Sequence, residues 1–205
     1  IETRTLIEDV VKVGDATDPG INSKLLKFYQ DTTLQSLIAA VEAEYADIDD
    51  LNHSFCQAFT KLKKSFPSIR VPRVYTQISA LDQSVVVGNG MIGISLDKYL
   101  GEDYPAYKRF YTAQQRRQMN RRNILPDCLT FFMLSEFQLE NFELRPQIER
   151  DLHMGKLQWV ANQILGARIY DTKYVSAIDH YMRHHPHTSY SQLVDMTDFS
   201  QFQVE

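Results

Sequence analysis

The chain contains little that would place it in a specialised class of protein. It has two cysteines, Cys56 and Cys128, which are too few for a disulfide framework. Each lies among apolar neighbours on a predicted helix, so we expect both to be buried and reduced. No window of about twenty apolar residues is long enough to cross a membrane. No charged and then apolar leader opens the chain, so a targeting segment was either removed or never present.

The net charge and the motifs exclude several functions. The chain has a formal net charge of −4 over 205 residues. Its overall charge therefore does not favour binding to nucleic acid, which is itself negatively charged. The sequence has neither a Gly-x-Ser-x-Gly elbow nor a glycine-rich phosphate loop. Asp127 and Glu136 are nine residues apart, about two and a half helical turns, so they point to opposite sides and do not form an acid–base pair. We therefore predict no catalytic residue and no cofactor, and we favour a protein that is not an enzyme.

The composition is that of a folded protein. The chain is 43% hydrophobic, and its length suits one sizeable core. We predict an α+β fold, mainly helical and packed on a small antiparallel sheet, in a single domain over residues 1–205. Its parts are a helical N-terminal part over residues 1–70, a sheet and core helix over 71–140, and C-terminal helices over 146–185.

The sheet prediction depends on three short segments. Apolar and polar residues alternate over Val74–Ser79, and branched residues fill Val85–Gly88 and alternate positions of Ile92–Leu96. Such alternation is typical of strands with one covered face. Asn89 and Gly90, between the second and third segments, suit the two positive-φ positions of a type I′ turn and predict a hairpin.

The helix prediction depends on caps and on apolar spacing. Asp31 can cap a helix whose apolar residues recur every three or four positions, and a second stripe follows over Leu51–Phe66. Pro126 suits the first turn of a helix that is apolar nearly all round and therefore belongs in the core. Two further helices are predicted over Pro146–Gly166 and Thr172–His184, the latter being the last.

The segment from about Arg73 to Leu165 resembles the GldB family, the gliding-motility lipoproteins of Bacteroidetes-type bacteria. The likeness lies in the order of the sequence segments VYTQIS, SVVVGNGMIGISLDKYLG, DYPAYKRF, LPDCLTFFMLSEF and MGKLQWVANQIL. The resemblance implies a cell-envelope protein on the periplasmic face, anchored in the membrane only by a lipid on a cysteine upstream of this chain. It also implies envelope proteins as partners and a role in motility or an associated secretion apparatus.

A more distant likeness is to zincin-like metallopeptidases, which share the order of strand, hairpin, apolar helix and later glycine-containing helix. In those enzymes a helix after the sheet carries His-Glu-x-x-His, which binds zinc and activates water. The corresponding helix here, from Pro126 onward, contains no histidine. If the scaffold is shared, packing has replaced the metal site.

His180 and His184 are the candidates for a metal site. They lie one helical turn apart and could share an ion. However, Tyr181 takes the position that a catalytic glutamate would need. Surface histidines at a helix end, favoured by the helix dipole, are the ordinary explanation, so we predict no metal ligand.

Two segments are candidates for an interaction surface. Arg117 and Arg121 belong to a basic run that could gather on one side of a helix and bind an anionic partner, or could form only a solvated face. The tyrosine-rich connection could line a groove for a sugar or peptide, or could anchor a loop to the sheet. Its candidate residues are Asp97, Tyr99, Tyr104 and Pro105.

The leading hypothesis is a non-catalytic envelope protein that acts by protein–protein interaction. One alternative is a zinc-dependent hydrolase that takes its ligands from the C-terminal histidines. Another is a glycan or peptide binder that uses the tyrosine-rich connection. A measurement of metal content separates the first two hypotheses.

Overall fold

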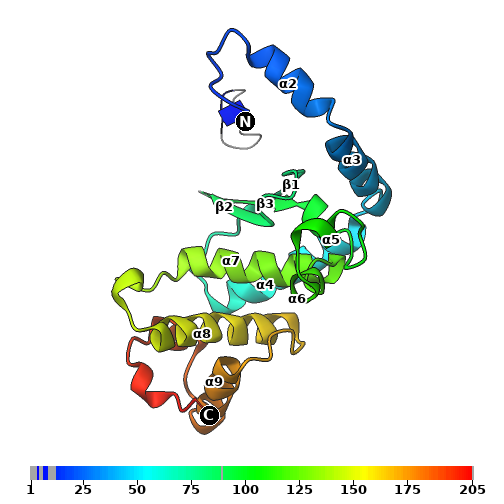
Figure 1. Ribbon diagram of the computed structural model, residues 1–205. Coiled ribbons are helices and arrows are strands. Elements are labelled where there is room, and N and C mark those ends of the chain that lie inside the picture. Colours follow the sequence, from blue (N-terminus) through cyan, green and yellow to red (C-terminus); the bar gives the residue numbers. More distant parts are fainter. Residues whose placement is uncertain (1–3, 5–6, 9–12, 89, 205) are drawn as a thin grey trace. The chain divides into compact units, whose positions relative to one another are not determined.

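The structure, a computed structural model, describes residue 4, residues 7–8, 13–88 and 90–204. These residues are mainly helical with one three-stranded sheet (Figure 1), which confirms the predicted α+β class. The α-helices are α2 (Ile21–Tyr29), α3 (Thr32–Glu44), α4 (Asp49–Ser65), α5 (Tyr107–Phe110), α6 (Ala113–Arg116), α7 (Ile124–Glu136), α8 (Gln147–Leu165), α9 (Lys173–His184) and α10 (Tyr190–Asp195). The strands are β1 (Arg73–Gln77), β2 (Val85–Gly88) and β3 (Met91–Ser95), and the 3₁₀ turns are η2 (Leu96–Lys98), η3 (Arg121–Asn123), η4 (Phe142–Leu144) and η5 (Phe199–Gln201).

The chain divides into two compact units. Unit 1 comprises Ile1–Ile48, Val74–Val86 and Gly93–Asn123, and unit 2 comprises Asp49–Arg73, Val87–Ile92 and Ile124–Glu205. Each unit is therefore assembled from three separate stretches of sequence. The single domain expected from the sequence stays a prediction.

The sheet is mixed, whereas the sequence predicted an antiparallel one. Strand β3 lies between β1 and β2. The Arg73 N–H donates to the Gly90 carbonyl (2.9 Å), and the Gln77 amide donates to Ser95 Oγ (3.2 Å), so β1 and β3 run in the same direction. The Ser95 N–H donates to the Ser84 carbonyl (2.9 Å), as expected of an antiparallel β2–β3 pair. Alternation fixes which face a side chain is on but not the direction of the neighbouring strand, which is why the prediction was wrong.

The predicted hairpin turn falls partly on Asn89, which lies outside the described residues. Gly90 has a φ of +73°, a conformation that glycine adopts without steric cost. The type of this turn stays a prediction. Residues 1–3, 5–6 and 9–12 of the predicted helical N-terminal part also lie outside the described residues.

The predicted ends of three helices are confirmed: the start of α3, both ends of α8 and the start of α9. The Asp31 carboxylate accepts the Leu34 N–H (2.9 Å) at the start of α3. Helix α8 runs between Pro146 and Gly166, and Gly166 ends it with a φ of +69°. The Thr172 hydroxyl accepts a backbone N–H at the start of α9. Two details were wrong: α7 begins at Ile124 rather than at Pro126, and α10 and η5 follow the helix that was predicted to be the last.

Helix α8 is central to unit 2, where it contacts α4, α7, α9 and α10 (Figure 1). Gly155 allows α9 to approach closely, because a Cβ built on it would lie only 2.9 Å from the Cβ of Tyr174. Helix α7 buries Cys128, Leu129 and Met133 completely or almost so, which confirms its prediction as a core helix. In the described part of the chain, no helix is both long and apolar enough to cross a membrane.

The two cysteines differ in exposure. Cys128 is buried as predicted, but Cys56 is exposed, so the prediction for Cys56 was wrong. The buried side of α4 carries Phe55, Ala58, Phe59 and Leu62. Cys56 follows Phe55 directly, so its side chain lies about 100° around the helix from that stripe.

Lys156 attaches the C-terminal part of unit 2 to α8. Its side chain is fully buried, and its Nζ donates to the carbonyls of Val194 (3.0 Å) and Met196 (2.6 Å). The same Nζ lies 4.9 Å from the centre of the Phe199 ring. Burial lowers the pKa of Lys156 to about 8, and the charge of Asp195 opposes this shift.

His153 is the second buried titratable group of α8. Its Nε2 is 2.8 Å from the Phe137 carbonyl, to which it donates. Its Nδ1 is buried without a hydrogen-bond partner among the described residues. Burial lowers the pKa of His153 to about 4, and the neighbouring positive charge of Lys156 adds to the effect. The ring is therefore neutral at physiological pH.

Candidate functional site

The loop between β1 and β2 holds two strained residues in unit 1. Ala80 and Leu81 have φ values of +53° and +69°, in the left-handed region that costs a residue other than glycine roughly 1–2 kcal/mol. The Asp97 carboxylate accepts the backbone N–H groups of Ser79 (3.0 Å) and Leu81 (2.6 Å). These bonds to one carboxylate hold the Leu81 loop, defined as Ser79–Asp82, in its strained conformation.

The carbonyl of Leu81 is held as firmly as its N–H. The Tyr111 hydroxyl donates to it (2.7 Å), and so does Lys98 Nζ (3.2 Å). Lys98 also donates to the Tyr111 hydroxyl (2.7 Å) and lies 4.4 Å from the centre of its ring. The Leu81 loop is therefore fixed by three side chains: Asp97 and Lys98 of η2, and Tyr111, the residue after α5.

Asp97 acts from below the protein surface. Its side chain is fully buried, and burial raises the pKa of its carboxyl group, whereas the bonds from Ser79 and Leu81 oppose that rise. Its role in the structure is to position the loop.

The Leu81 loop forms one wall of an apolar groove of about 680 Å³. The other walls come from the junction of α2 with α3 and from the end of α5, so all of the lining belongs to unit 1. This volume is in the range of ligand-binding clefts. The apolar and aromatic residues of the unit 1 groove are Phe28, Leu34, Leu37, Ala80, Leu81, Phe110 and Tyr111.

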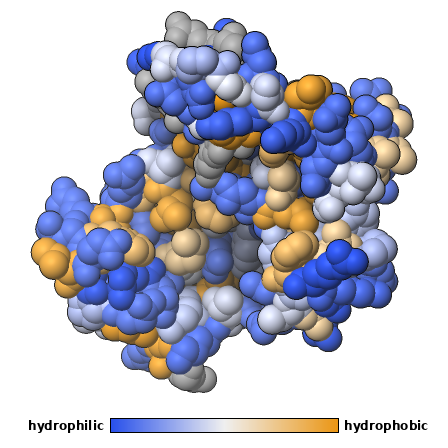
Figure 2. Space-filling model, turned by 45° about the horizontal axis from the view of Figure 1, so that its top comes forward, coloured by the Kyte–Doolittle hydropathy of each residue, from blue (hydrophilic) through white to orange (hydrophobic). Residues whose placement is uncertain are grey.

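A large apolar side chain is exposed at the groove. Phe110, which lines it, is 65% exposed. Figure 2 shows that apolar side chains reach the surface of the molecule in patches among hydrophilic ones. Apolar patches rimmed by polar residues mark sites of interaction with other molecules.

The tyrosine-rich connection predicted as a surface lies mostly inside unit 1. Tyr99 is buried, and its carbonyl accepts the hydroxyl of Tyr45 (2.6 Å). Tyr104 is half-buried with its ring edge-on to Tyr107, and Pro105 is exposed. Because Asp97 and Tyr99 are buried, they can contribute to an interaction only by positioning the exposed residues that cover them. The proposed surface itself stays a prediction.

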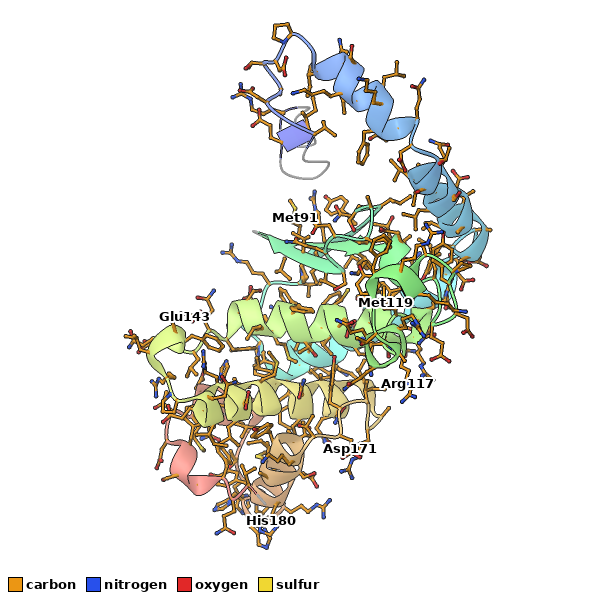
Figure 3. The ribbon with its side chains drawn as sticks, in the orientation of Figure 1. Met91, Arg117, Met119, Glu143, Asp171 and His180 are labelled. Atoms are coloured by element: carbon orange, nitrogen blue, oxygen red, sulfur yellow. The ribbon has the colours of Figure 1, made fainter. Side chains whose placement is uncertain are left out.

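The basic run does not form one face of a helix. Helix α6 ends at Arg116, and Arg121 begins η3. The Arg121 guanidinium donates to the carbonyls of Glu44 (2.9 Å) and Asp47 (2.8 Å) and lies 4.9 Å from the centre of the Tyr45 ring. Arg117 is exposed and points away from the ribbon (Figure 3). Arg121 therefore closes the C-terminal end of α3, where carbonyls lack helical partners.

His180 and His184 lie next to each other at the surface of α9. Their ring centres are 4.3 Å apart, and His184 Nδ1 donates to the His180 carbonyl (2.8 Å). Figure 3 shows His180 at the outer side of its helix. Among the described residues, no three His, Cys, Asp or Glu side chains are grouped so that they could hold a metal ion.

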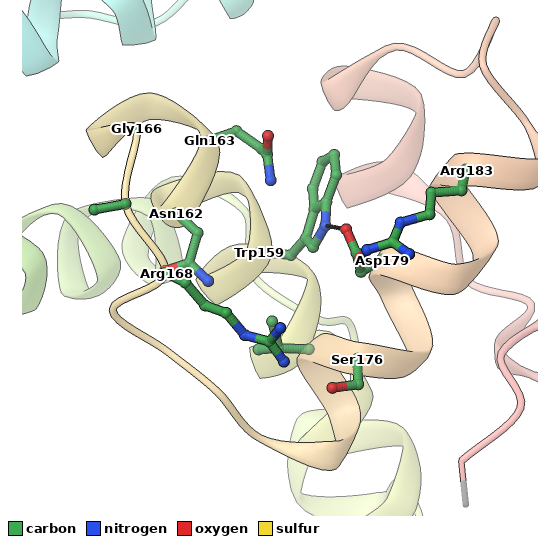
Figure 4. A pocket seen from close by; sticks show the side chains of 10 residues that line it. Trp159, Asn162, Gln163, Gly166, Arg168, Ser176, Asp179 and Arg183 are labelled. Carbon is green, nitrogen blue, oxygen red and sulfur yellow. Dashed lines mark hydrogen bonds and ion pairs between the residues drawn. The ribbon is translucent and has the colours of Figure 1, made fainter.

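A second, polar pocket of about 370 Å³ lies in unit 2, lined by residues of α8, of α9 and of the loop between them (Figure 4). The Trp159 indole N–H donates to Asp179 (3.0 Å), which also pairs with Arg183. The Asn162 side chain accepts the N–H of Tyr170 (3.0 Å) and donates to its carbonyl (2.8 Å). Because these polar groups are already paired within the fold, the pocket is a weaker candidate than the unit 1 groove.

Sequence reasoning missed the unit 1 groove and the polar pocket of unit 2. The unit 1 groove combines Leu34, Leu81 and Phe110, which lie far apart in the chain. Neither Ala80 nor Leu81 is a residue type that signals a positive φ. Only the position of Phe110, directly after two basic residues in a short polar stretch, could have indicated an exposed aromatic side chain.

These features define an α+β protein with a prearranged apolar groove on one of its two units. Over residues 2–173 the sequence matches the family model described as gliding motility protein GldB. The chain therefore belongs to the GldB family, which confirms the resemblance and identifies it as a gliding-motility lipoprotein of the cell envelope. No curated protein and no solved structure matches the chain significantly. The likeness to zincin-like metallopeptidases stays a hypothesis.

Proposed function

We propose that this protein is a non-catalytic component of the cell envelope that binds another envelope protein through the unit 1 groove. The observation that carries the proposal is the groove itself, with the Leu81 loop fixed as one of its walls. Membership of the GldB family supports the setting: the periplasmic face, with a lipid anchor in the full-length protein as the only attachment to the membrane.

The groove offers affinity at low entropic cost. Burying one fully exposed Phe side chain contributes roughly 1.5–3 kcal/mol, and Phe110 is more than half exposed. The Leu81 loop is already held by Asp97, Lys98 and Tyr111, so little backbone freedom is lost when a partner binds.

The polar groups of the groove do not suggest catalysis. Nucleophilic or acid–base chemistry needs a nucleophile and a base within hydrogen-bond reach of each other. The Asp31 carboxylate accepts the N–H of Leu34, and the Tyr111 hydroxyl donates to the Leu81 carbonyl. These two groups therefore serve the structure of the groove, which supports recognition rather than turnover.

A complementation experiment tests the proposal. In a strain that lacks the gene, full-length protein with Phe110→Asp should fail to restore gliding, because a charge replaces the exposed apolar anchor of the groove. Its melting temperature should stay near that of the wild type, since Phe110 is 65% exposed.

Leu144→Asp is the matched control, because Leu144 is 85% exposed and belongs to unit 2. It should restore gliding fully. Normal gliding with Phe110→Asp, at normal protein levels, would show that the groove is not the site of function.

A further inference from the structure

The surroundings of the unit 1 groove are basic in a chain that is acidic as a whole. The chain has a formal net charge of −4. Yet Lys27 lines the groove, and Lys108 and Arg109 directly precede the exposed ring of Phe110. All three residues are exposed, and their side chains form no ion pair within the described part of the chain. They are therefore available to a partner.

A fourth cation lies beside the groove-lining residue Tyr111. Arg116 donates from Nη1 to the Tyr111 carbonyl (3.2 Å), while its Nε is buried without a hydrogen-bond partner among the described residues. A buried guanidinium N–H that lacks an acceptor is costly. Because this Nε is buried, it is not open to a partner, and Arg116 contributes only its positive charge.

The two acidic residues of these segments do not cancel this charge. Asp31 uses its carboxylate to cap α3 by accepting the Leu34 N–H (2.9 Å). Asp82 follows Leu81 and already has an interaction within the chain. Lys27, Lys108 and Arg109 are thus exposed cations without an ion pair in the described part of the chain, whereas the Asp31 carboxylate is already engaged in the fold.

We propose that the unit 1 groove recognises a partner segment that combines large apolar side chains with flanking Asp or Glu residues. The inference rests on the proposed function and specifies the chemistry of the partner. The apolar residues fill the groove against Phe28, Leu81 and Phe110, and the acidic residues meet Lys27, Lys108 and Arg109 at its edge. Apolar contacts supply the affinity, and the charges supply orientation and association rate.

Site-specific photocrosslinking tests this chemistry. Full-length protein with benzoylphenylalanine at position 110 is expressed in its native cells, irradiated, purified and digested, and the crosslinked peptide is identified by mass spectrometry. We expect a segment of another envelope protein with apolar residues flanked by Asp or Glu within one helical turn. Adding Lys27→Glu, Lys108→Glu and Arg109→Glu should lower the crosslink yield roughly tenfold, the sum of three modest surface charge effects.

Lys61→Glu, Lys64→Glu and Arg70→Glu, at exposed positions of unit 2, form the matched charge reversal and should leave the yield unchanged. A crosslinked protein segment with neutral or basic flanks would overturn this inference while leaving the proposed function intact. Crosslinks to lipid alone, to a second copy of the chain, or to nothing would overturn both.

Discussion

A single buried carboxylate links the core of unit 1 to its surface. Asp97 is fully enclosed, yet its two oxygens accept the N–H groups on either side of Ala80. Ala80 and Leu81 would not keep a left-handed backbone without such support. The shape of the groove wall is therefore decided one layer below the residues that a partner would touch.

Asp97→Asn should destabilise the protein by about 1–3 kcal/mol, because an amide can accept at only one of its two side-chain atoms and leaves a buried N–H unsatisfied. Urea denaturation measures the change. Asp103→Asn, at an exposed position of the following turn, should change stability by less than about 0.5 kcal/mol. Equal stability of the two variants would show that Asp97 does not hold the loop.

The sequence singled out Asp97 as a candidate for an interaction surface but did not predict its burial. Strand alternation ends at Leu96, so the pattern contains no signal for the burial of the next residue. The positive φ values of Ala80 and Leu81 could not be predicted either, because turn prediction depends on Gly, Asn, Asp and Pro. The fixed wall of the site could be found only from coordinates.

At the scale of elements, an arginine from a distant segment completes helix α3. Arg121 supplies donors to the carbonyls of Glu44 and Asp47 and covers the Tyr45 ring. The C-terminal carbonyls of a helix have no partner within it. A side chain 77 positions away thus does what a local cap usually does.

Arg121→Met keeps an apolar stem but removes both hydrogen bonds, so it should lower stability by about 1 kcal/mol and speed hydrogen exchange at the end of α3. Arg117→Met, on an exposed and outward-pointing side chain, should change neither quantity. Unchanged exchange in Arg121→Met would mean that the end of α3 is held by other contacts.

Elements with local signals were predictable, and those without were not. Asp31, Pro146, Gly166 and Thr172 marked helix ends correctly because capping is a property of adjacent residues. The same logic could have found α10, whose Ser189 and Gln192 form a capping box. The parallel pairing of β1 with β3 has no such local signature.

At the scale of the whole molecule, the interleaving of segments in the two units could not be foreseen. All three strands change unit within their length: β1 after Arg73, β2 after Val86 and β3 after Ile92. Hydrophobic patterning says which residues are buried, and it does not say which distant segment buries them.

Global stability should depend on pH through His153. Its pKa is about 4 in the folded protein, compared with about 6.5 in the unfolded chain. The unfolded state therefore takes up the proton first, and stability is lost as the pH falls from 6.5 towards 4. Between pH 7 and pH 5 the loss should be about 1–2 kcal/mol, measured by urea denaturation at each pH.

His153→Gln retains a donor for the Phe137 carbonyl but does not titrate, so its stability should change less between these two pH values. His187→Gln, at an exposed position, should keep the full pH dependence. An undiminished slope in His153→Gln would assign the acid sensitivity to other groups.

The contrast between the two cysteines makes the native sequence ready for spectroscopic labelling. Cys56 is open to solvent on α4, whereas Cys128 is enclosed in α7, where burial raises the pKa of its thiol and suppresses the reactive thiolate. A maleimide dye or nitroxide added to the folded protein should thus attach at one defined point. A second adduct would form only when Cys128 becomes exposed. The rate at which it appears would therefore measure how fast the helical core opens.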